Sequence, residues 1–116
     1  HIHEYTLYTY DKRTDVFEDE TIPYRIDGSL GVTLIQADID GILAVLTDNE
    51  TKDKDFMLCG KSAIALLGKD GTLTQIDDLD KRVEWVDSQT GQQFTLLVRD
   101  VEDGRYALRQ YAINPA

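Results

Sequence analysis

The chain has 116 residues, a length that suits one domain with one hydrophobic core. Its 22 acidic and 12 basic residues give a formal net charge of −10, and such a charge repels phosphate backbones and anionic lipids. No apolar run approaches the roughly 20 residues that cross a bilayer. We therefore predict a single domain over residues 1–116 that has no nucleic-acid or membrane partner and that is compatible with basic proteins or cations.

The first half of the chain contains several predicted strands. Residues 1–10 are rich in aromatic and β-branched side chains, which predicts one strand. Residues 22–26 contain Pro23, which cannot donate a ladder hydrogen bond, so we expect this segment at a sheet edge or at the start of a strand. Residues 32–35 and 42–46 are short and almost wholly apolar, which is typical of central strands.

Asp-Gly pairs recur along the chain, and they begin at residues 27, 40, 70 and 103. An Asp-Gly pair supplies the positive φ angles that a tight reversal needs. Short apolar runs between regularly spaced turns are typical of antiparallel β-proteins. The sequence therefore predicts an all-β fold, a single antiparallel β-sandwich that is immunoglobulin-like or related.

One segment has two interpretations. Leu79, Val83 and Val86 recur at helical spacing, which favours a short helix near residues 77–86. The same segment, followed by a polar turn and a clear strand, also fits a hairpin in which Trp85 lies opposite that next strand.

Residues 94–113 predict two long strands folded about one Asp-Gly turn. The first strand alternates apolar with other side chains, which places one set on a core face. In the second strand the apolar positions change parity between Leu108 and Tyr111. We interpret this change as a β-bulge near residues 109–110; the alternative is a strand covered on both faces.

The run Glu102-x-Gly104-x-Tyr106-x-Leu108 resembles the acid-x-Gly-x-Tyr-x-Cys run at the tyrosine corner of immunoglobulin-like sandwiches, with Leu108 in place of the cysteine. The resemblance implies structural roles for Gly104 in the turn and for Tyr106, whose hydroxyl would bond to nearby backbone. The wider run LLVRDVEDGRYALRQYAIN resembles the last strands of the sandwich that follows the catalytic barrel in bacterial family 39 glycoside hydrolases. That resemblance includes no catalytic residue and implies an accessory or linker-type sandwich.

The window of residues 47–55 is the most polar in the chain and predicts an exposed loop. Loops of this kind bind calcium in some sandwiches, and many others bind nothing. If this loop binds Ca²⁺, the ligands are the carboxylates of Asp48, Glu50, Asp53 and Asp55.

Catalytic patterns are missing from the sequence. The body of the chain has no histidine to act as a base beside Ser62, Ser88 or Cys59, and it has no Gly-x-Ser-x-Gly run. Cys59 is the only cysteine, so no intrachain disulfide forms. We therefore predict that the protein is not an enzyme and holds no cofactor other than the calcium considered above.

Aromatic side chains are the remaining candidates for binding. If Tyr5, Tyr8, Tyr10 and Trp85 lie on an exposed sheet face, their rings can stack on sugars or anchor a protein. The alternative is that most of the aromatic residues are half-buried strand residues whose polar groups contact water. We expect a binding or accessory module of a larger carbohydrate-processing or surface protein, with a protein partner or neighbouring domain and with a secreted or cell-surface location favoured over a cytoplasmic one. The alternative is a small acidic inhibitor or immunity-type protein that covers a basic protein partner.

Overall fold

The computed structural model describes residues 2–5, 8–19, 24–38, 41–68, 70–90 and 93–112. Within these residues every regular element is a β-strand, so they include no helix that spans a membrane. The strands are β1 (Ile2–Tyr5), β2 (Tyr8–Asp11), β3 (Val16–Asp19), β4 (Tyr24–Asp27), β5 (Leu30–Asp38), β6 (Gly41–Asp48), β7 (Ser62–Gly68), β8 (Leu73–Asp78), β9 (Arg82–Thr90), β10 (Gln93–Arg99) and β11 (Tyr106–Ala112). The predicted all-β fold is confirmed.

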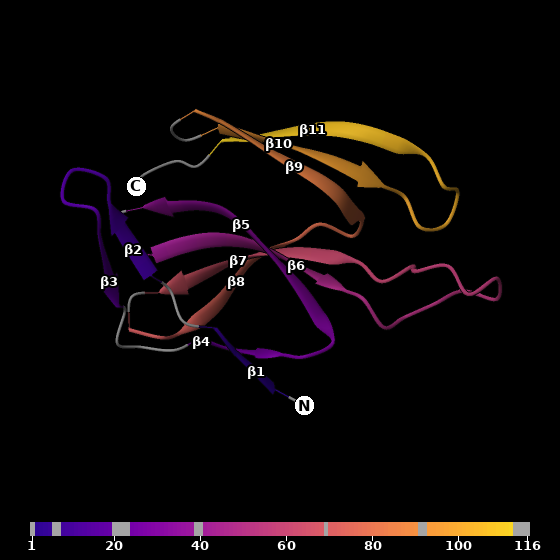
Figure 1. Ribbon diagram of the computed structural model, residues 1–116. Helices are drawn as coiled ribbons and strands as arrows, with labels where there is room; N and C mark the ends of the chain where they lie inside the picture. The colour runs from indigo at the N-terminus through magenta and orange to yellow at the C-terminus, as the bar shows by residue number, and fades with distance from the viewer. Residues whose placement is uncertain are drawn as a thin grey trace.

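The strands are arranged in layers (Figure 1). A four-stranded antiparallel sheet, in the order β5-β6-β7-β8, lies in the middle, and a three-stranded antiparallel sheet, in the order β11-β10-β9, packs on one face of it. The pair β1-β4 covers the other face, and β2-β3 forms a separate two-stranded pair. The sandwich prediction is confirmed, but both main sheets are meanders, whereas immunoglobulin domains exchange strands between sheets through Greek-key connections.

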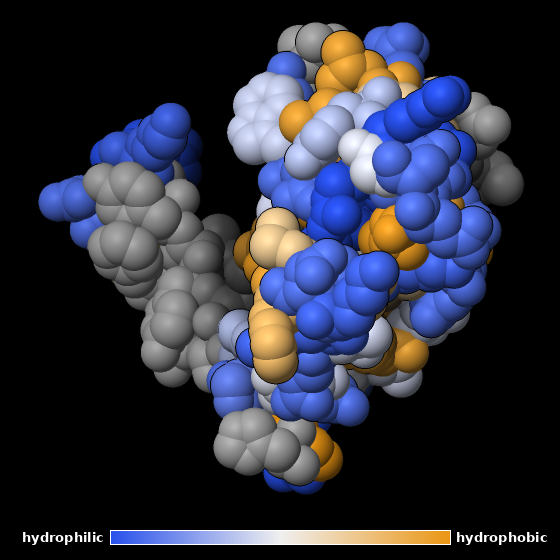
Figure 2. Space-filling model, turned by 90° about the vertical axis from the view of Figure 1, so that its right-hand side faces the viewer, coloured by the Kyte–Doolittle hydropathy of each residue, from blue (hydrophilic) through white to orange (hydrophobic). Residues whose placement is uncertain are grey.

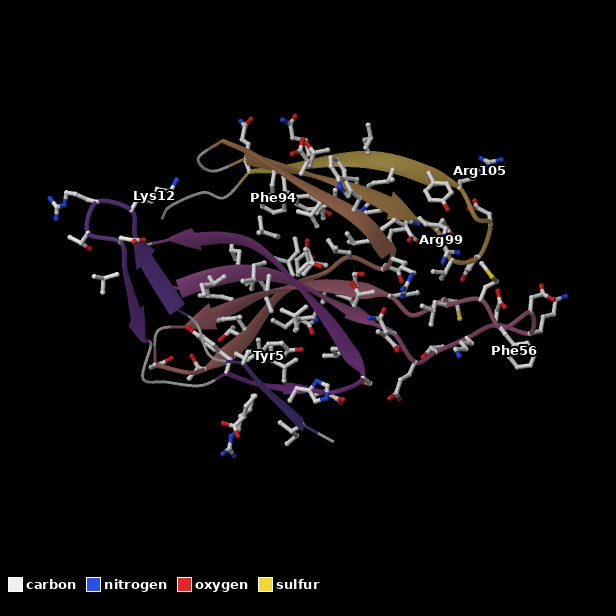
Figure 3. All side chains as sticks on the ribbon, viewed as in Figure 1. Tyr5, Lys12, Phe56, Phe94, Arg99 and Arg105 are labelled. Carbon is white, nitrogen blue, oxygen red and sulfur yellow. The ribbon has the colours of Figure 1, made fainter. Side chains whose placement is uncertain are left out.

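The main core lies between the two larger sheets. Phe94, Leu96 and Val98 of β10 are buried on the inner face and pack with Val45 of β6 and Ile64 of β7. Figure 3 shows Phe94 between the two sheets. The predicted alternation in β10 is therefore confirmed, and it fixes which face of the three-stranded sheet is outside.

A second core lies on the opposite face of the four-stranded sheet. Tyr24 and Ile26 of β4 pack with Ile42 and Ala44 of β6. Strand β6 is apolar on both faces because it lies between two layers. The prediction of a central strand holds for residues 42–46, but β5 is an edge strand, so the same prediction for residues 32–35 is wrong.

The helix predicted near residues 77–86 is wrong. Strand β8 ends at Asp78 and β9 begins at Arg82. The link between them pairs with the start of β7: the Leu79 N–H donates to the Ser62 carbonyl at 3.1 Å, and the Ser62 N–H donates to the Lys81 carbonyl at 2.7 Å. These tertiary hydrogen bonds stabilise the extended link more than the local helical preference of the segment would stabilise a helix. The hairpin interpretation is confirmed, because Trp85 lies opposite Leu97.

The β-bulge predicted near residues 109–110 is also wrong, because β10 and β11 pair without a register shift. Tyr111 instead points to the core side and stacks on Phe94, with ring centroids 5.6 Å apart. Leu108 is on the outer face and is 70% exposed. The parity change thus marks a strand that carries apolar side chains on both faces while only one face is covered.

The amino-terminal strand is divided. Residues 1–10 were predicted as one strand, but β1 pairs with β4 and β2 pairs with β3.

Two of the predicted Asp-Gly turns are confirmed by their backbone angles. Gly71 and Gly104 have φ angles of 86° and 75°, as tight reversals at these Asp-Gly pairs require.

Candidate functional site

Residues 49–61 connect β6 and β7 as a projecting β-ribbon rather than as an irregular loop. We call this segment the ribbon. The Asp48 N–H donates to the Lys61 carbonyl at 3.0 Å, and the Cys59 N–H donates to the Thr51 carbonyl at 2.9 Å. Lys52 and Leu58 form a further antiparallel bridge. In Figure 1 the ribbon extends beyond the sheets.

Two aspartates hold the turns of the ribbon. Oδ1 of Asp48 accepts the N–H groups of Glu50 and Thr51 at 2.8 and 3.1 Å, and its Oδ2 accepts the Thr51 hydroxyl. These bonds, led by the one from the Thr51 hydroxyl, lower the pKa of Asp48. Oδ1 of Asp53 accepts the N–H groups of Asp55 and Met57 at 2.8 and 3.1 Å.

The predicted calcium ligands are Asp48, Glu50, Asp53 and Asp55, and all four lie on or next to the ribbon. Within the described residues no three histidine, cysteine, aspartate or glutamate side chains gather where they would hold a metal ion. Asp48 and Asp53 instead satisfy backbone N–H groups of the ribbon. The structure does not assemble the predicted calcium site.

Two arginines fix the ribbon to the three-stranded sheet. Nη1 of the buried Arg82 donates to the carbonyls of Asp48 at 2.7 Å and Gly60 at 3.1 Å, and its Nη2 donates to Asn49 Oδ1 at 3.0 Å. Nη2 of Arg99 donates to the Leu58 carbonyl at 2.6 Å. Arginine suits this role because its fork of donors reaches several acceptors at once.

Glu84 lies between these two arginines. Its Oε1 accepts the Arg99 Nε–H at 2.8 Å and lies 3.8 Å from Arg82 Nε. The hydrogen bond to Glu84 raises the pKa of Arg99. Figure 3 shows Arg99 at the end of β10, near the root of the ribbon. The ribbon is therefore held by side chains that come from the sheet of β9, β10 and β11.

The tip of the ribbon presents two apolar side chains. Phe56 is 82% exposed and Met57 is also exposed. Phe56 has a φ angle of 62°, in the left-handed region where glycine and asparagine are favoured and where other residues cost about 1–2 kcal/mol. Its N–H donates to the Asp53 carbonyl at 3.1 Å. Figure 3 shows Phe56 at the far end of the ribbon.

A cleft of about 460 Å³ lies between the ribbon and the three-stranded sheet. Figure 2, which faces this end of the molecule, shows hydrophobic (orange) atoms among hydrophilic (blue) ones. The cleft thus combines apolar walls with the two arginines that hold the ribbon. Its lining residues are Phe56, Met57, Leu58, Arg82, Glu84, Arg99 and Tyr106.

Tyr106 does not take the corner position that the resemblance implied. Its side chain is 61% exposed and lines this cleft, and its hydroxyl forms no hydrogen bond with any residue that the structure describes. Gly104 does fulfil its turn role: its N–H donates to the Asp100 carbonyl at 2.8 Å. A structural tyrosine corner is therefore not formed, although the turn before it is.

The predicted aromatic binding residues do not share one surface. Trp85 is 56% exposed; it pairs with Leu97 of β10 and lies on the outer face of the three-stranded sheet. Tyr5 belongs to the layer on the opposite side of the molecule and lines, with Tyr24, a cavity of about 210 Å³. The side chains of Tyr8 and Tyr10 lie outside the described residues.

Sequence reasoning missed the residues that build the ribbon end: Phe56, Met57, Arg82 and Arg99. For Phe56 a signal exists, because two turn-forming aspartates, Asp53 and Asp55, come just before this large apolar side chain. For the arginines there is none, since their acceptors lie far away in the sequence.

Comparisons with known proteins add no relative: no family model, no curated protein and no solved structure matches the chain. The resemblance to the family 39 sandwich remains a prediction.

Proposed function

We propose that this domain is a non-enzymatic binding module, an accessory part of a larger protein, and that it contacts a protein partner through the ribbon tip. The observation that carries this proposal is Phe56. A large aromatic side chain stands 82% exposed at a backbone conformation that costs free energy, on a ribbon that two arginines hold in place. Strained residues persist where the surroundings impose them, and they concentrate at ligand-contacting sites.

The surroundings of Phe56 have the properties of an interface. Aromatic residues, methionine and arginine are enriched at protein interfaces, and the cleft beside the tip is lined by Phe56, Met57, Arg99 and Tyr106. A ribbon held in its bound conformation loses little conformational entropy on association. Both features favour recognition of a partner by a preformed surface.

The charge near the tip indicates what the partner carries. Residues 48–58 include four acidic and two basic side chains, a net charge of −2 (two minus four), in a chain of net charge −10. We infer a partner with an apolar pocket whose rim is basic, because complementary charge raises association rates and selects partners. Carbohydrate contact has less support, since Trp85 belongs to β9 and Tyr5 to β1, and these strands lie on opposite sides of the middle sheet (Figure 1).

The ribbon tip could also be the contact surface of the second candidate function, a small acidic inhibitor. The dependence of binding affinity on salt concentration distinguishes the accessory binding module from the inhibitor. If charge dominates, as in an inhibitor of a basic site, affinity falls steeply between about 0.05 and about 0.5 M salt, because screening lengths shrink to a few ångströms. If the apolar tip dominates, affinity changes little over this range.

Site-specific crosslinking tests the proposal. We would replace Phe56 with p-benzoylphenylalanine, and as a control Leu34, which is similarly apolar and exposed on β5. The proposal expects one protein to crosslink at position 56 and not at 34 in the cells that make this chain. With that purified protein, Phe56→Asn should weaken binding about thirtyfold, the effect of a 2 kcal/mol hot spot. Equal crosslinking at both positions, or unchanged affinity of Phe56→Asn, would refute it.

A further inference from the structure

The two main sheets do not match in width. The middle sheet has four strands and the sheet that covers it has three. Strand β9 contacts β5 and β6, the two strands of the middle sheet that are farthest from its β8 edge. All six residues of β8 are exposed, including the apolar Leu73 and Ile76. The core is therefore open along β8.

A cleft of about 360 Å³ marks the opening. It lies between the edge of β8, at Ile76 and Asp77, and the end of β11, at Tyr111 and Ala112. Its remaining walls are the buried core side chains Leu43, Ile64 and Phe94. Apolar core residues are thus reachable from outside at the place where a fourth strand of the smaller sheet would lie.

The edge strands differ in how they are protected against further pairing. A bulge in an edge strand disrupts the ladder and hinders the addition of another strand. The register skips Ile35 in β5, Ile76 in β8, and both Glu84 and Gln89 in β9, so each of these edges is bulged. Strand β11 pairs with β10 over its seven residues without a shift and contains no proline. Among the edges of the two main sheets, β11 is the regular one.

The side chains of β11 indicate what a strand beside it would need. Arg109 pairs in register with Leu96, so it lies on the core side of the sheet, as Tyr111 does. β11 contains no acidic residue, and Arg109 forms no ion pair within the part of the chain that the structure describes. A neighbouring strand is complementary if its core-side residues are apolar beside Tyr111 and acidic beside Arg109.

We propose that β11 and this cleft accept one extended segment of a partner chain, which adds as a fourth strand to the three-stranded sheet. Backbone hydrogen bonds to β11 supply affinity, and alternate apolar side chains enter the cleft and supply specificity. The added strand covers Ile76 and completes a sandwich of four strands over four. The cleft at Ile76 shares no lining residue with the cleft beside the ribbon tip, and of β11 only Tyr106, its first residue, borders the latter. The inference therefore does not depend on the proposed function.

A designed peptide tests the proposal directly. The probe is a capped peptide of the length of β11, seven residues, with isoleucine, glutamate and isoleucine at alternate positions and threonine elsewhere. Amide hydrogen exchange, followed by NMR, should slow in β11 when the peptide is added, and a matched peptide with serine in place of isoleucine should have no effect. If the isoleucine peptide leaves β11 unprotected at millimolar concentration, the proposal is wrong.

Two variants on β8 show whether the cleft takes part. Ile76→Lys replaces an apolar wall of the cleft with an ammonium group and should weaken peptide binding about tenfold or more, because the added strand would have to desolvate that charge. Leu73→Lys is the control: Leu73 is exposed on the same strand, but it pairs with Leu67, which packs in the other core. Ile76→Gln replaces the lysine variant if circular dichroism shows that Ile76→Lys is unfolded. Equal binding by the Ile76 and Leu73 variants contradicts a role for the cleft.

Sedimentation of the intact chain tests whether a second copy of the chain, and not a different partner, pairs with β11. If the chain forms dimers in which the β11 amides are protected, the occupant is a second copy, and the assignment to a partner chain is overturned. A monomer supports the assignment, and Phe56→Asn should bind the peptide as the unchanged chain does.

Discussion

The guanidinium of Arg99 donates a hydrogen bond to the backbone carbonyl of Leu58, 2.6 Å away, across a sequence separation of 41 residues. Together with Arg82, this contact joins the ribbon to a sheet in which none of the ribbon's own strands takes part. The side chains of Arg82 and Arg99 therefore hold the ribbon in position. Substituting these arginines measures how much their contacts contribute to the free energy of unfolding.

Arg82→Met should destabilise the protein by about 2–3 kcal/mol, because it leaves the carbonyls of Asp48 and Gly60 without their donor. Urea denaturation measures the change. Arg105→Met is the control: Arg105 is almost fully exposed, and its substitution should change the free energy of unfolding by no more than about 0.5 kcal/mol. Similar losses in the two variants would contradict the role assigned to Arg82.

Phe56→Asn should raise the free energy of unfolding by roughly 0.5–1 kcal/mol, because asparagine adopts the left-handed conformation at lower cost and the lost side chain is exposed. Chemical denaturation provides the measurement. Met57→Asn, at a residue without a positive φ angle, should bring no such gain. A marked loss of stability in Phe56→Asn would show that the phenyl ring contributes to the fold.

Gly60→Ala should destabilise the protein by about 1–3 kcal/mol, since a Cβ at this buried position would clash with the carbonyl oxygen of Asp48. Gly104→Ala is the comparison: a Cβ there meets no atom within 4 Å, so only the φ angle of 75° is penalised, by about 1 kcal/mol. Gly104→Asn should recover part of the second loss. Thermal denaturation of the three variants distinguishes a steric cost from a conformational one.

Stability should decrease as the pH falls from about 4 to about 2. The hydrogen bond from Lys81 Nζ, 2.6 Å from Asp100 Oδ2, and those from the Glu102 and Asp103 N–H groups lower the pKa of Asp100 from 3.8 to about 2. A lowered pKa in the folded state contributes stability above the unfolded value, and this contribution is lost as the pH falls through the folded value.

Asp100→Asn tests this assignment, because it should remove part of the acid-induced decrease in melting temperature. The control is Asp55→Asn, which removes an exposed carboxylate that accepts no hydrogen bond in the described ranges. If both variants show the same pH dependence as the unchanged chain, Asp100 is not responsible.

Calcium should leave the melting temperature unchanged, because Asp48 and Asp53 already accept hydrogen bonds from the ribbon and no cluster of ligands is formed among the described residues. Differential scanning fluorimetry with excess Ca²⁺ and with EDTA measures this. A rise in melting temperature that saturates with Ca²⁺ would show that the ribbon rearranges to bind it.

Local patterns predicted much of the fold. The alternation of Phe94, Leu96 and Val98 identified the core face of β10, and the Asp-Gly pairs identified the turns at Gly71 and Gly104. These features depend on neighbours along the chain. The helix near residues 77–86 failed because the backbone of the link bonds to Ser62, and no local pattern contains that information.

The candidate site was predicted less well for the same reason. The exposed polar segment was found, but its carboxylates were interpreted as metal ligands, whereas Asp48 and Asp53 hold turns. Tyr106 was assigned to a corner from a short resemblance, although its exposure depends on which face of β11 is covered. Arg82 became recognisable only when the distant carbonyls of Asp48 and Gly60 were seen beside it.

Arg82 is also the first residue of β9, directly after the link that joins the two sheets, and the next residue, Val83, donates its N–H to the Ser62 hydroxyl at 2.9 Å. Opening the ribbon at its root therefore breaks contacts at the junction of the sandwich itself. The ribbon and the two sheets should behave as one cooperative unit, so that the amides at the ribbon root exchange through global unfolding and not through local fraying.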